Sequence, residues 1–209
     1  MKEDLYHALL MEYANGCLDE GQSLIIAAHV ALSPSARKTV AQYESVGGAI
    51  LDDCCGKVDM TKDALARVLN KIDCGNSPAP CAEKKLKTAA YLNMPNCLQT
   101  YLESATWTDS KNGYQHISVR TSCHRSKAQI YKIEPDTAFR VTSRSPHQLT
   151  LVLEGSFHDG KSVFRRGDLI VTTDNVVLYS DAEQGCIAAI AHPSSFNVRR
   201  FVQQIFIRY

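Results

Sequence analysis

The sequence has no surplus of either charge, no long hydrophobic run and a single tryptophan among its 209 residues. Lysine and arginine number 23 against 22 acidic residues, and a net charge of +1 gives no basic field for nucleic acid or anionic lipid. The longest apolar stretch, 24–32, is interrupted by His29 and is too short to cross a bilayer. No apolar run follows the charged first residues, so no signal peptide is expected. We expect a soluble, cytoplasmic chain that contacts neither nucleic acid directly nor a membrane.

Recognisable catalytic arrangements are also missing. The chain has no glycine-rich phosphate loop, no paired carboxylates and no nucleophile beside a base at an informative spacing. Asp52 and Asp53 fall at the end of a predicted helix, where solvated carboxylates are common. The sequence therefore predicts a protein that is not an enzyme.

The eight cysteines include no C-x-x-C pair. Without a sign of secretion, reduced thiols are expected, some of them buried as small apolar side chains. Cys54 and Cys55 are adjacent and would be the first to test as a redox-sensing pair.

Hydrophobic periodicity predicts four helices before residue 75. The first ends at Asn15-Gly16, the second carries the 24–32 stretch, and Ser33-Pro34 gives the third, 34–54, a cap followed by a first-turn proline. The fourth begins near Thr61. We expect an apolar core shared by all four helices, with a docking face for a partner on the third and fourth.

From about Leu98 onward, short alternating or apolar runs separated by Asp-Gly, Gly-Asp and Asp-Asn turns predict strands. Many such strands in about 120 residues favour a barrel or a sandwich. The expected organisation is a helical domain at 1–75, a linker at 76–95 and a β-barrel domain at 96–209. The predicted strands are 117–119, 128–133, 148–153, 163–164, 169–173, 176–179, 186–190 and 201–207.

Two segments of the second half resemble the motifs of cupin (jelly-roll) barrels. Residues 151–157 resemble the end of the first cupin motif, and 164–168, with its Gly-Asp turn, the start of the second. The resemblance places the usual metal ligands at Thr142, Arg144 and Gln148, and at Val177 or Leu178. These side chains do not form a metal site, because a divalent ion needs converging imidazole or carboxylate donors.

A cupin barrel without its usual metal ligands has two possible roles. A guanidinium at Arg144 favours an anion, so Thr142, Arg144 and Gln148 are the candidate ligand-binding residues, with His147 on the rim. Alternatively, side chains fill the barrel, and it serves as a structural or regulatory module. We favour the filled barrel.

The whole chain resembles the ChrR family of anti-sigma factors. The resemblance rests on residues 7–16, 23–32 and 46–50, on Trp107, on the 149–157 strand and on the order of the domains. It implies a helical domain that clamps an extracytoplasmic-function sigma factor and a cupin domain that governs release.

The resemblance also implies a zinc site in the helical domain, made by two histidines and two cysteines. His7 and His29 match the histidines, whereas Ser33 and Ala36 stand where the cysteines would be. Two histidines alone make only a weak zinc site. We therefore expect no cofactor, with hydrogen bonds from both imidazoles tying the first two helices together.

Three functions compete. The first is an anti-sigma factor with a metal-free cupin as its sensing module. The second is a cupin that binds a small anion, with the helices as the dimerisation arm of a homodimer. The third is a thiol redox sensor. Domain order favours the first.

Overall fold

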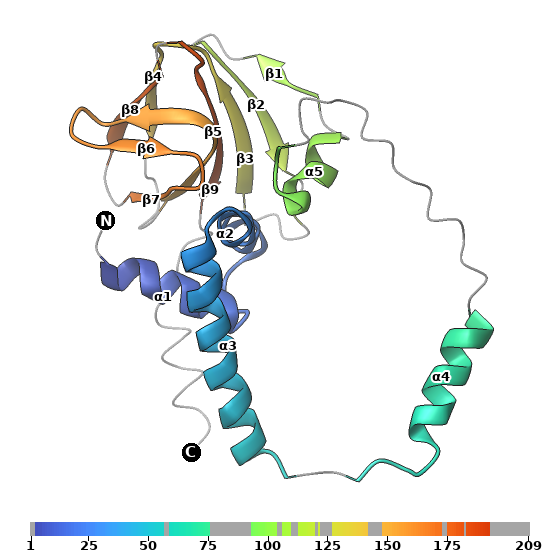
Figure 1. The fold of residues 1–209 in the computed structure, drawn as a ribbon. Coiled ribbons are helices and arrows are strands. Elements are labelled where there is room, and N and C mark those ends of the chain that lie inside the picture. The colour runs from blue at the N-terminus through green and yellow to red at the C-terminus, as the bar shows by residue number, and fades with distance from the viewer. Residues whose placement is uncertain are drawn as a thin grey trace.

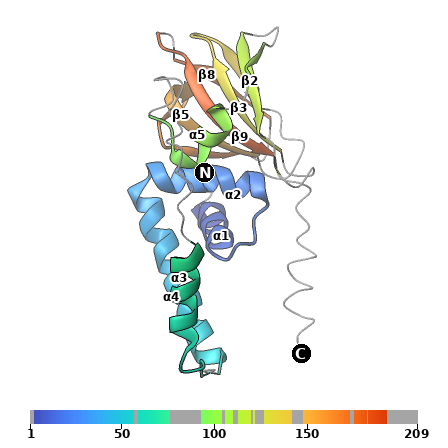
Figure 2. The same ribbon diagram turned by 90° about the vertical axis from the view of Figure 1, so that its right-hand side faces the viewer.

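The computed structural model describes residues 3–56, 59–75, 93–103, 106–109, 113–119, 121, 127–141, 148–172, 175–181 and 183–192. A helical region and a curled sheet stack end to end (Figures 1 and 2). Within the described residues no helix has the length and apolar character that a membrane span requires.

The structure has five described helices, and the first four begin and end close to where the local signals place them. The five are α1 (Glu3–Ala14), α2 (Glu20–Leu32), α3 (Pro34–Cys54), α4 (Ala64–Gly75) and α5 (Asn96–Glu103). The Asp19 side chain caps α2 by accepting a hydrogen bond from the amide of Gln22 at 2.9 Å. Ser33 caps α3 in the same way through the amide of Ala36 at 3.3 Å. The serine cap and the proline that follows it define the predicted start of the third helix.

Nine described strands form one continuous sheet that curls into a barrel-like shape. The order along the sheet is β1-β2-β3-β9-β5-β8-β4, with β6 and β7 also pairing with β5. All pairings are antiparallel. The strands are β1 (Thr108–Asp109), β2 (Tyr114–Val119), β3 (Lys127–Ile133), β4 (Ala138–Val141), β5 (Gln148–His158), β6 (Val163–Arg165), β7 (Leu169–Thr172), β8 (Val176–Ser180) and β9 (Cys186–His192).

Strand β5 shows how the sheet separates two cores. Successive side chains of a strand point to opposite faces. Leu149 and Leu151 join the core that the sheet shares with α1, α2, α3 and α5. Val152 and Phe157 join a second core inside the curled sheet. Helix α2 lies across the outer face of β3, β5 and β9, so the helical region is built directly onto the barrel.

The expected core of four helices is not what the structure shows. Helices α1, α2 and the first turns of α3 pack together and onto the sheet, and Ala36 and Val40 are the buried residues of α3. Helix α4 stands apart from them (Figure 1), and none of its described side chains is buried. The shared core takes its remaining members from the barrel and from α5.

Three elements were missed in the sequence, helix α5 and strands β1 and β4. Residues 96–103, expected near the first strands, form helix α5, whose Leu98 and Leu102 are buried against the sheet. Strands β1 (Thr108–Asp109) and β4 (Ala138–Val141) also went unpredicted. Met94, in the predicted 76–95 linker, is buried in the shared core. The predicted strand 201–207 lies outside the described residues.

Candidate functional site

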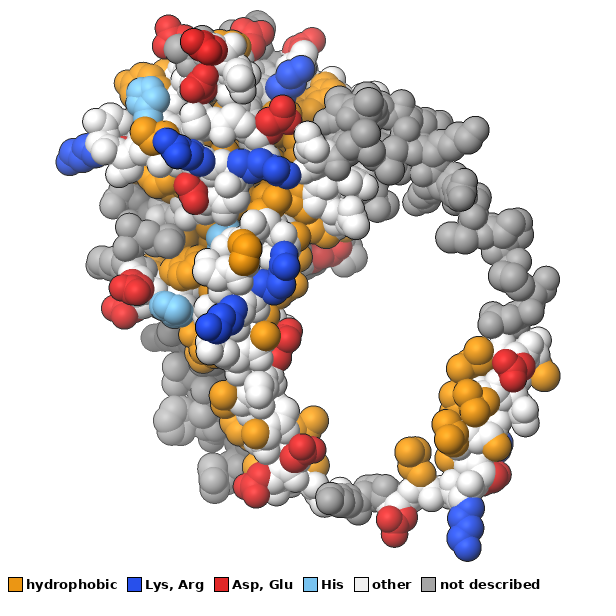
Figure 3. Space-filling view, viewed as in Figure 1, with side chains coloured by type: hydrophobic (Ala, Val, Ile, Leu, Met, Phe, Trp, Pro, Cys, Tyr) orange, Lys and Arg blue, Asp and Glu red, His pale blue; other side chains and the backbone are white. Residues whose placement is uncertain are grey.

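Helices α3 and α4 expose large apolar side chains to solvent. On α4 they recur at the spacing of one helix face and are between 49% and 70% exposed. On the far half of α3 they are between 57% and 61% exposed. Figure 3 shows hydrophobic side chains gathered on the side of α4 that faces α3. We call this set the α3–α4 apolar face; it comprises Val46, Ile50, Leu51, Leu65, Val68, Leu69 and Ile72.

Gly47 and Gly48 lie within the exposed half of α3. Each glycine in a helix interior costs about 1 kcal/mol relative to alanine. A Cβ atom added at either position would meet no atom within 4 Å, so no contact with the described residues requires glycine there. Bare backbone on an exposed helix permits close approach of another chain, which fits a docking role for this half of α3.

His29 lies at the junction of the helices with the barrel and is only 4% exposed. Its Nδ1 is 2.8 Å from the carbonyl oxygen of Gly167, in the turn before β7, and its Nε2 is 2.9 Å from the hydroxyl of Tyr6 on α1. The neutral imidazole with its proton on Nδ1 satisfies both contacts, donating to Gly167 and accepting from Tyr6. His29 therefore joins α1, α2 and the barrel.

His7 makes a different contact. Its Nδ1 is 3.2 Å from the hydroxyl of Tyr43 on α3, so it ties α1 to α3 rather than to α2. Both histidines form hydrogen bonds between helices, as predicted, and in each case the partner on the other helix is a tyrosine. The predicted link between the first two helices is made by His29 alone. The sequence suggested neither tyrosine, because Tyr6 and Tyr43 become neighbours of the histidines only through the packing of α1 against α2 and α3.

The positions that the resemblance assigns to zinc do not fit a zinc site. The Ser33 hydroxyl caps α3, and Ala36 is buried and apolar. Both nitrogens of His29 already have partners. Among the described residues, no three His, Cys, Asp or Glu side chains gather as metal ligands would.

In the barrel, Gln148 is the one predicted ligand-binding residue that the structure describes, since Thr142, Arg144 and the rim residue His147 fall outside the described residues. Gln148 is 3% exposed, and its Oε1 has no hydrogen-bond partner among the described residues. The same is true of the Thr150 hydroxyl oxygen. Leu178, at the third histidine position, is buried in the inner core.

Aromatic side chains fill much of the barrel interior. Tyr114, Tyr131 and Phe139 pack edge to face, with ring centroids between 5.1 and 5.7 Å apart, and Phe139 stacks on Phe157. Burial raises the pKa of Tyr131 to about 12, with a smaller contribution from Tyr114. The interior is thus largely apolar, with polar groups remaining near Gln148.

The described cysteines are free thiols in contrasting settings. Cys17, Cys54, Cys55 and Cys74 are exposed, and no disulfide joins any of the cysteines that the structure describes. Cys186 is buried in the barrel, and burial raises the pKa of its thiol well above its usual value. Cys54 and Cys55 sit at the end of α3, at the border of the α3–α4 apolar face.

The burial of His29 predicts a pH-dependent stability. Desolvation lowers the pKa of His29, although the Gly167 carbonyl and the Asp168 carboxylate oppose the shift. Between the lowered pKa and the unfolded value of about 6.5, the unfolded chain binds more protons, so stability falls as the pH drops through this range. The slope due to this group is at most about 1.4 kcal/mol per pH unit. Urea titrations of the wild type and of His29→Gln between neutral and mildly acidic pH measure the difference. Equal slopes in the two proteins would contradict the assignment.

The fold and its junction define a class, a helical domain built onto the outer face of a cupin-type barrel. A search of protein-family models found no match. The anti-sigma-E factor ChrR of Cereibacter sphaeroides is 28% identical to this chain over 205 residues, covering 95% of each protein. The similarity confirms the predicted resemblance to ChrR over nearly the whole chain.

Solved structures agree on the architecture. A chain in the crystal structure of Rhodobacter sphaeroides SigE in complex with the anti-sigma ChrR matches with a TM-score of 0.71 and 24% identity. The match covers 89% of this chain and 96% of that one and confirms the predicted fold of a helical domain plus a cupin barrel. An RmlC-like cupin from Shewanella frigidimarina aligns with 47% of this chain and 90% of its own length at 20% identity, with a TM-score of 0.36.

Proposed function

We propose that this chain is an anti-sigma factor that binds an extracytoplasmic-function sigma factor between α3 and α4. The observation that carries the proposal is the α3–α4 apolar face. Apolar side chains at helical spacing that are left in solvent on two consecutive but separated helices are typical of a surface that a partner covers. The relative with 95% coverage is itself an anti-sigma factor, which supports the same function for this chain.

The partner would act on RNA polymerase, which places the complex in the cytoplasm. Regulation by binding requires no catalysis, so we propose that the protein has no enzymatic activity. The barrel would then serve as the module that senses a signal and changes the affinity of the helices for the partner.

Binding can be tested with purified proteins. Each extracytoplasmic-function sigma factor of the host organism is co-expressed with the tagged full-length chain and purified through the tag. A stoichiometric complex with one of them, together with inhibition of transcription from its promoter in vitro, is the expected result. If none co-purifies with the folded protein, the anti-sigma function is wrong.

We also propose that the helical domain needs no zinc. The hydrogen bonds of His7 and His29 to tyrosines occupy the place of a metal, and the Ser33 cap organises the start of α3. A structural zinc site contributes on the order of 10 kcal/mol to folding in small domains, so removal of such a zinc ion would lower the melting temperature strongly.

Chelation provides the measurement for this prediction. We expect dialysis against EDTA to leave both the melting temperature and sigma-factor binding unchanged, and elemental analysis of the untreated protein to find far less than one zinc per chain. A stoichiometric zinc content together with a drop of several degrees after chelation would contradict the proposal.

The barrel interior supports a second role, the binding of a small ligand. The support comes from Gln148, whose buried Oε1 lacks a partner in the part of the chain that the structure describes and would accept a hydrogen bond from a ligand. The contributions of Thr142 and Arg144 to that site, and the preference for an anion, remain predictions.

A further inference from the structure

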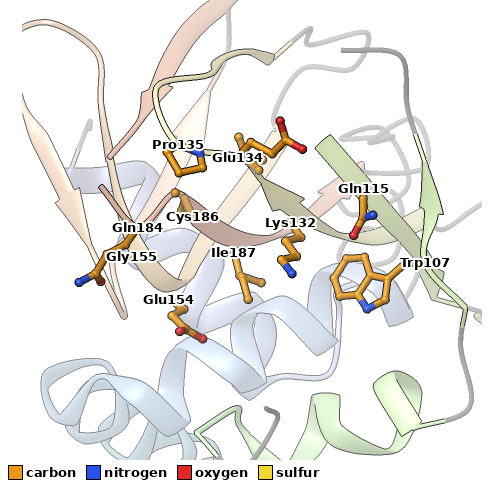
Figure 4. Close-up of a pocket in the computed structure, with 12 residues that line it drawn as sticks. Trp107, Gln115, Lys132, Glu134, Pro135, Glu154, Gly155, Gln184, Cys186 and Ile187 are labelled. Atoms are coloured by element: carbon orange, nitrogen blue, oxygen red, sulfur yellow. The ribbon is translucent and has the colours of Figure 1, made fainter. Parts of the chain in front are cut away.

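A cavity of about 520 Å³ lies against β3, β5 and β9, where Lys132, Glu154 and Ile187 line it together with Ile133 and Cys186 of the inner core (Figure 4). Its walls come from β2, β3, β5 and β9, from the turns after β3 and before β9, and from Trp107 just before β1. The volume falls within the range of small-molecule sites, about 300–1,000 Å³. The cavity is therefore large enough for a small organic ligand, and it is distinct from the Gln148 site inside the barrel.

One rung of the sheet places two opposite charges in this cavity. Lys132 on β3 pairs with Ile187 on β9, and Ile187 pairs with Glu154 on β5. Because neighbouring strands lie about 4.8 Å apart, the Cα atoms of Lys132 and Glu154 are about 10 Å apart, with Ile187 between them. Both charged residues are exposed, and neither forms an ion pair with another residue in the described part of the chain.

Two glycines and a β-bulge form one wall of the cavity, where backbone segments approach one another closely. A β-bulge between Val152 and Glu154 breaks the regular pairing of β5 with β9, and bulges re-aim the side chains beside them. Gly155 and Gly185 follow with positive φ angles of 75° and 69°. A Cβ atom on Gly155 would collide with the carbonyl oxygen of Gly185. This wall of the cavity is therefore bare backbone, and substitution by larger residues is excluded.

The cavity also adjoins the core that joins the two domains. Trp107 and Ile187 are partly buried and pack against that core. In Figure 4 the Trp107 ring, the Lys132 side chain and Ile187 lie next to one another, whereas the Glu134 carboxylate points away from them. The apolar part of an occupant would thus extend the core at the contact of barrel and helices.

We propose that this cavity binds an amino acid with a large apolar side chain. Its carboxylate pairs with the Lys132 ammonium, its ammonium pairs with the Glu154 carboxylate, and its side chain packs on Ile187 and the Trp107 ring. An inorganic anion would be repelled by Glu154, and a neutral hydrocarbon would leave both charges without partners. A zwitterion with an apolar body satisfies the charges and the apolar floor together.

Calorimetric titration of the full-length protein tests the assignment. The probes are L-phenylalanine, L-leucine and L-tryptophan at millimolar concentration, with N-acetyl-L-phenylalanine and L-phenylalaninamide as versions that lack one charge. We expect saturable binding of at least one amino acid. If it is phenylalanine, the two single-charge versions should bind at least about tenfold more weakly, because each loses a charge-assisted hydrogen bond.

Variants separate the site from nonspecific binding. Lys132→Met and Glu154→Gln should each weaken amino-acid binding at least about tenfold. Lys127→Met, at the other end of β3, should leave it unchanged. Unchanged affinity in the Lys132 and Glu154 variants, equal binding of the acetylated probe, or no binding of any of the three amino acids to the folded wild type would overturn the proposal.

Discussion

Replacement of Leu69 with aspartate should abolish sigma-factor binding and leave the folded chain as stable as the wild type. Leu69 lies at the centre of the apolar stripe of α4 and is 49% exposed in the free chain, so the substitution removes no core contact. In a complex the same position would be covered, and a buried, unpaired carboxylate costs several kcal/mol. We expect a loss of affinity of at least about 100-fold, measured by biolayer interferometry, with an unchanged melting temperature.

The matched control is Asn70→Asp, which adds the same negative charge one position along α4 on its polar side. Only Leu69→Asp should reduce affinity strongly if the apolar stripe makes the contact. A similar loss in both variants would indicate a general effect of charge on the helix. An unchanged affinity in both would place the sigma-factor contact elsewhere.

The helix boundaries could be predicted well because their signals are local. Ser33 and Pro34 fix the start of α3 through a side-chain hydrogen bond and a preset φ angle, and neither depends on distant residues. The packing of the helices is not local. Leu65, Val68, Leu69 and Ile72 have the spacing of a core-facing stripe, yet no element of the described chain covers them. Periodicity predicts that a face will be covered but does not say by which chain.

The sequence allowed some residues of the candidate site to be named but did not allow their contacts to be predicted. His7 and His29 could be singled out from the motif, but the partner of His29 in the barrel, the Gly167 carbonyl, is 138 residues away. A backbone carbonyl has no residue-type signature, so no pattern could reveal it. The cavity against β3, β5 and β9 was missed for a similar reason. Lys132, Ile187 and Glu154 are unremarkable in the sequence, and only the register of three strands aligns them.

The contact of His29 with Gly167 predicts that the two domains unfold as one unit and that His29→Leu separates them. Leucine fills a similar volume but leaves the Tyr6 hydroxyl and the Gly167 carbonyl without their partner. Two such losses cost about 2–4 kcal/mol in total. His7→Leu is the control, because His7 hydrogen-bonds Tyr43 on α3 and packs its ring on Tyr6 of α1, and no contact found for it among the described residues reaches the barrel. Its effect should be smaller and confined to the helices.

Two probes distinguish separation from simple destabilisation. Circular dichroism follows mainly the helices, and the fluorescence of Trp107, the only tryptophan, follows the barrel beside them. In the wild type we expect both signals to change at the same urea concentration, as a two-state transition requires. In His29→Leu the helices should unfold at a lower urea concentration than the barrel. The variant loses the hydrogen bond that attaches α2 to the barrel, and only the apolar packing of α2 on the sheet is left. Coincident transitions in the variant would show that the apolar packing of α2 on β3, β5 and β9 alone holds the domains together.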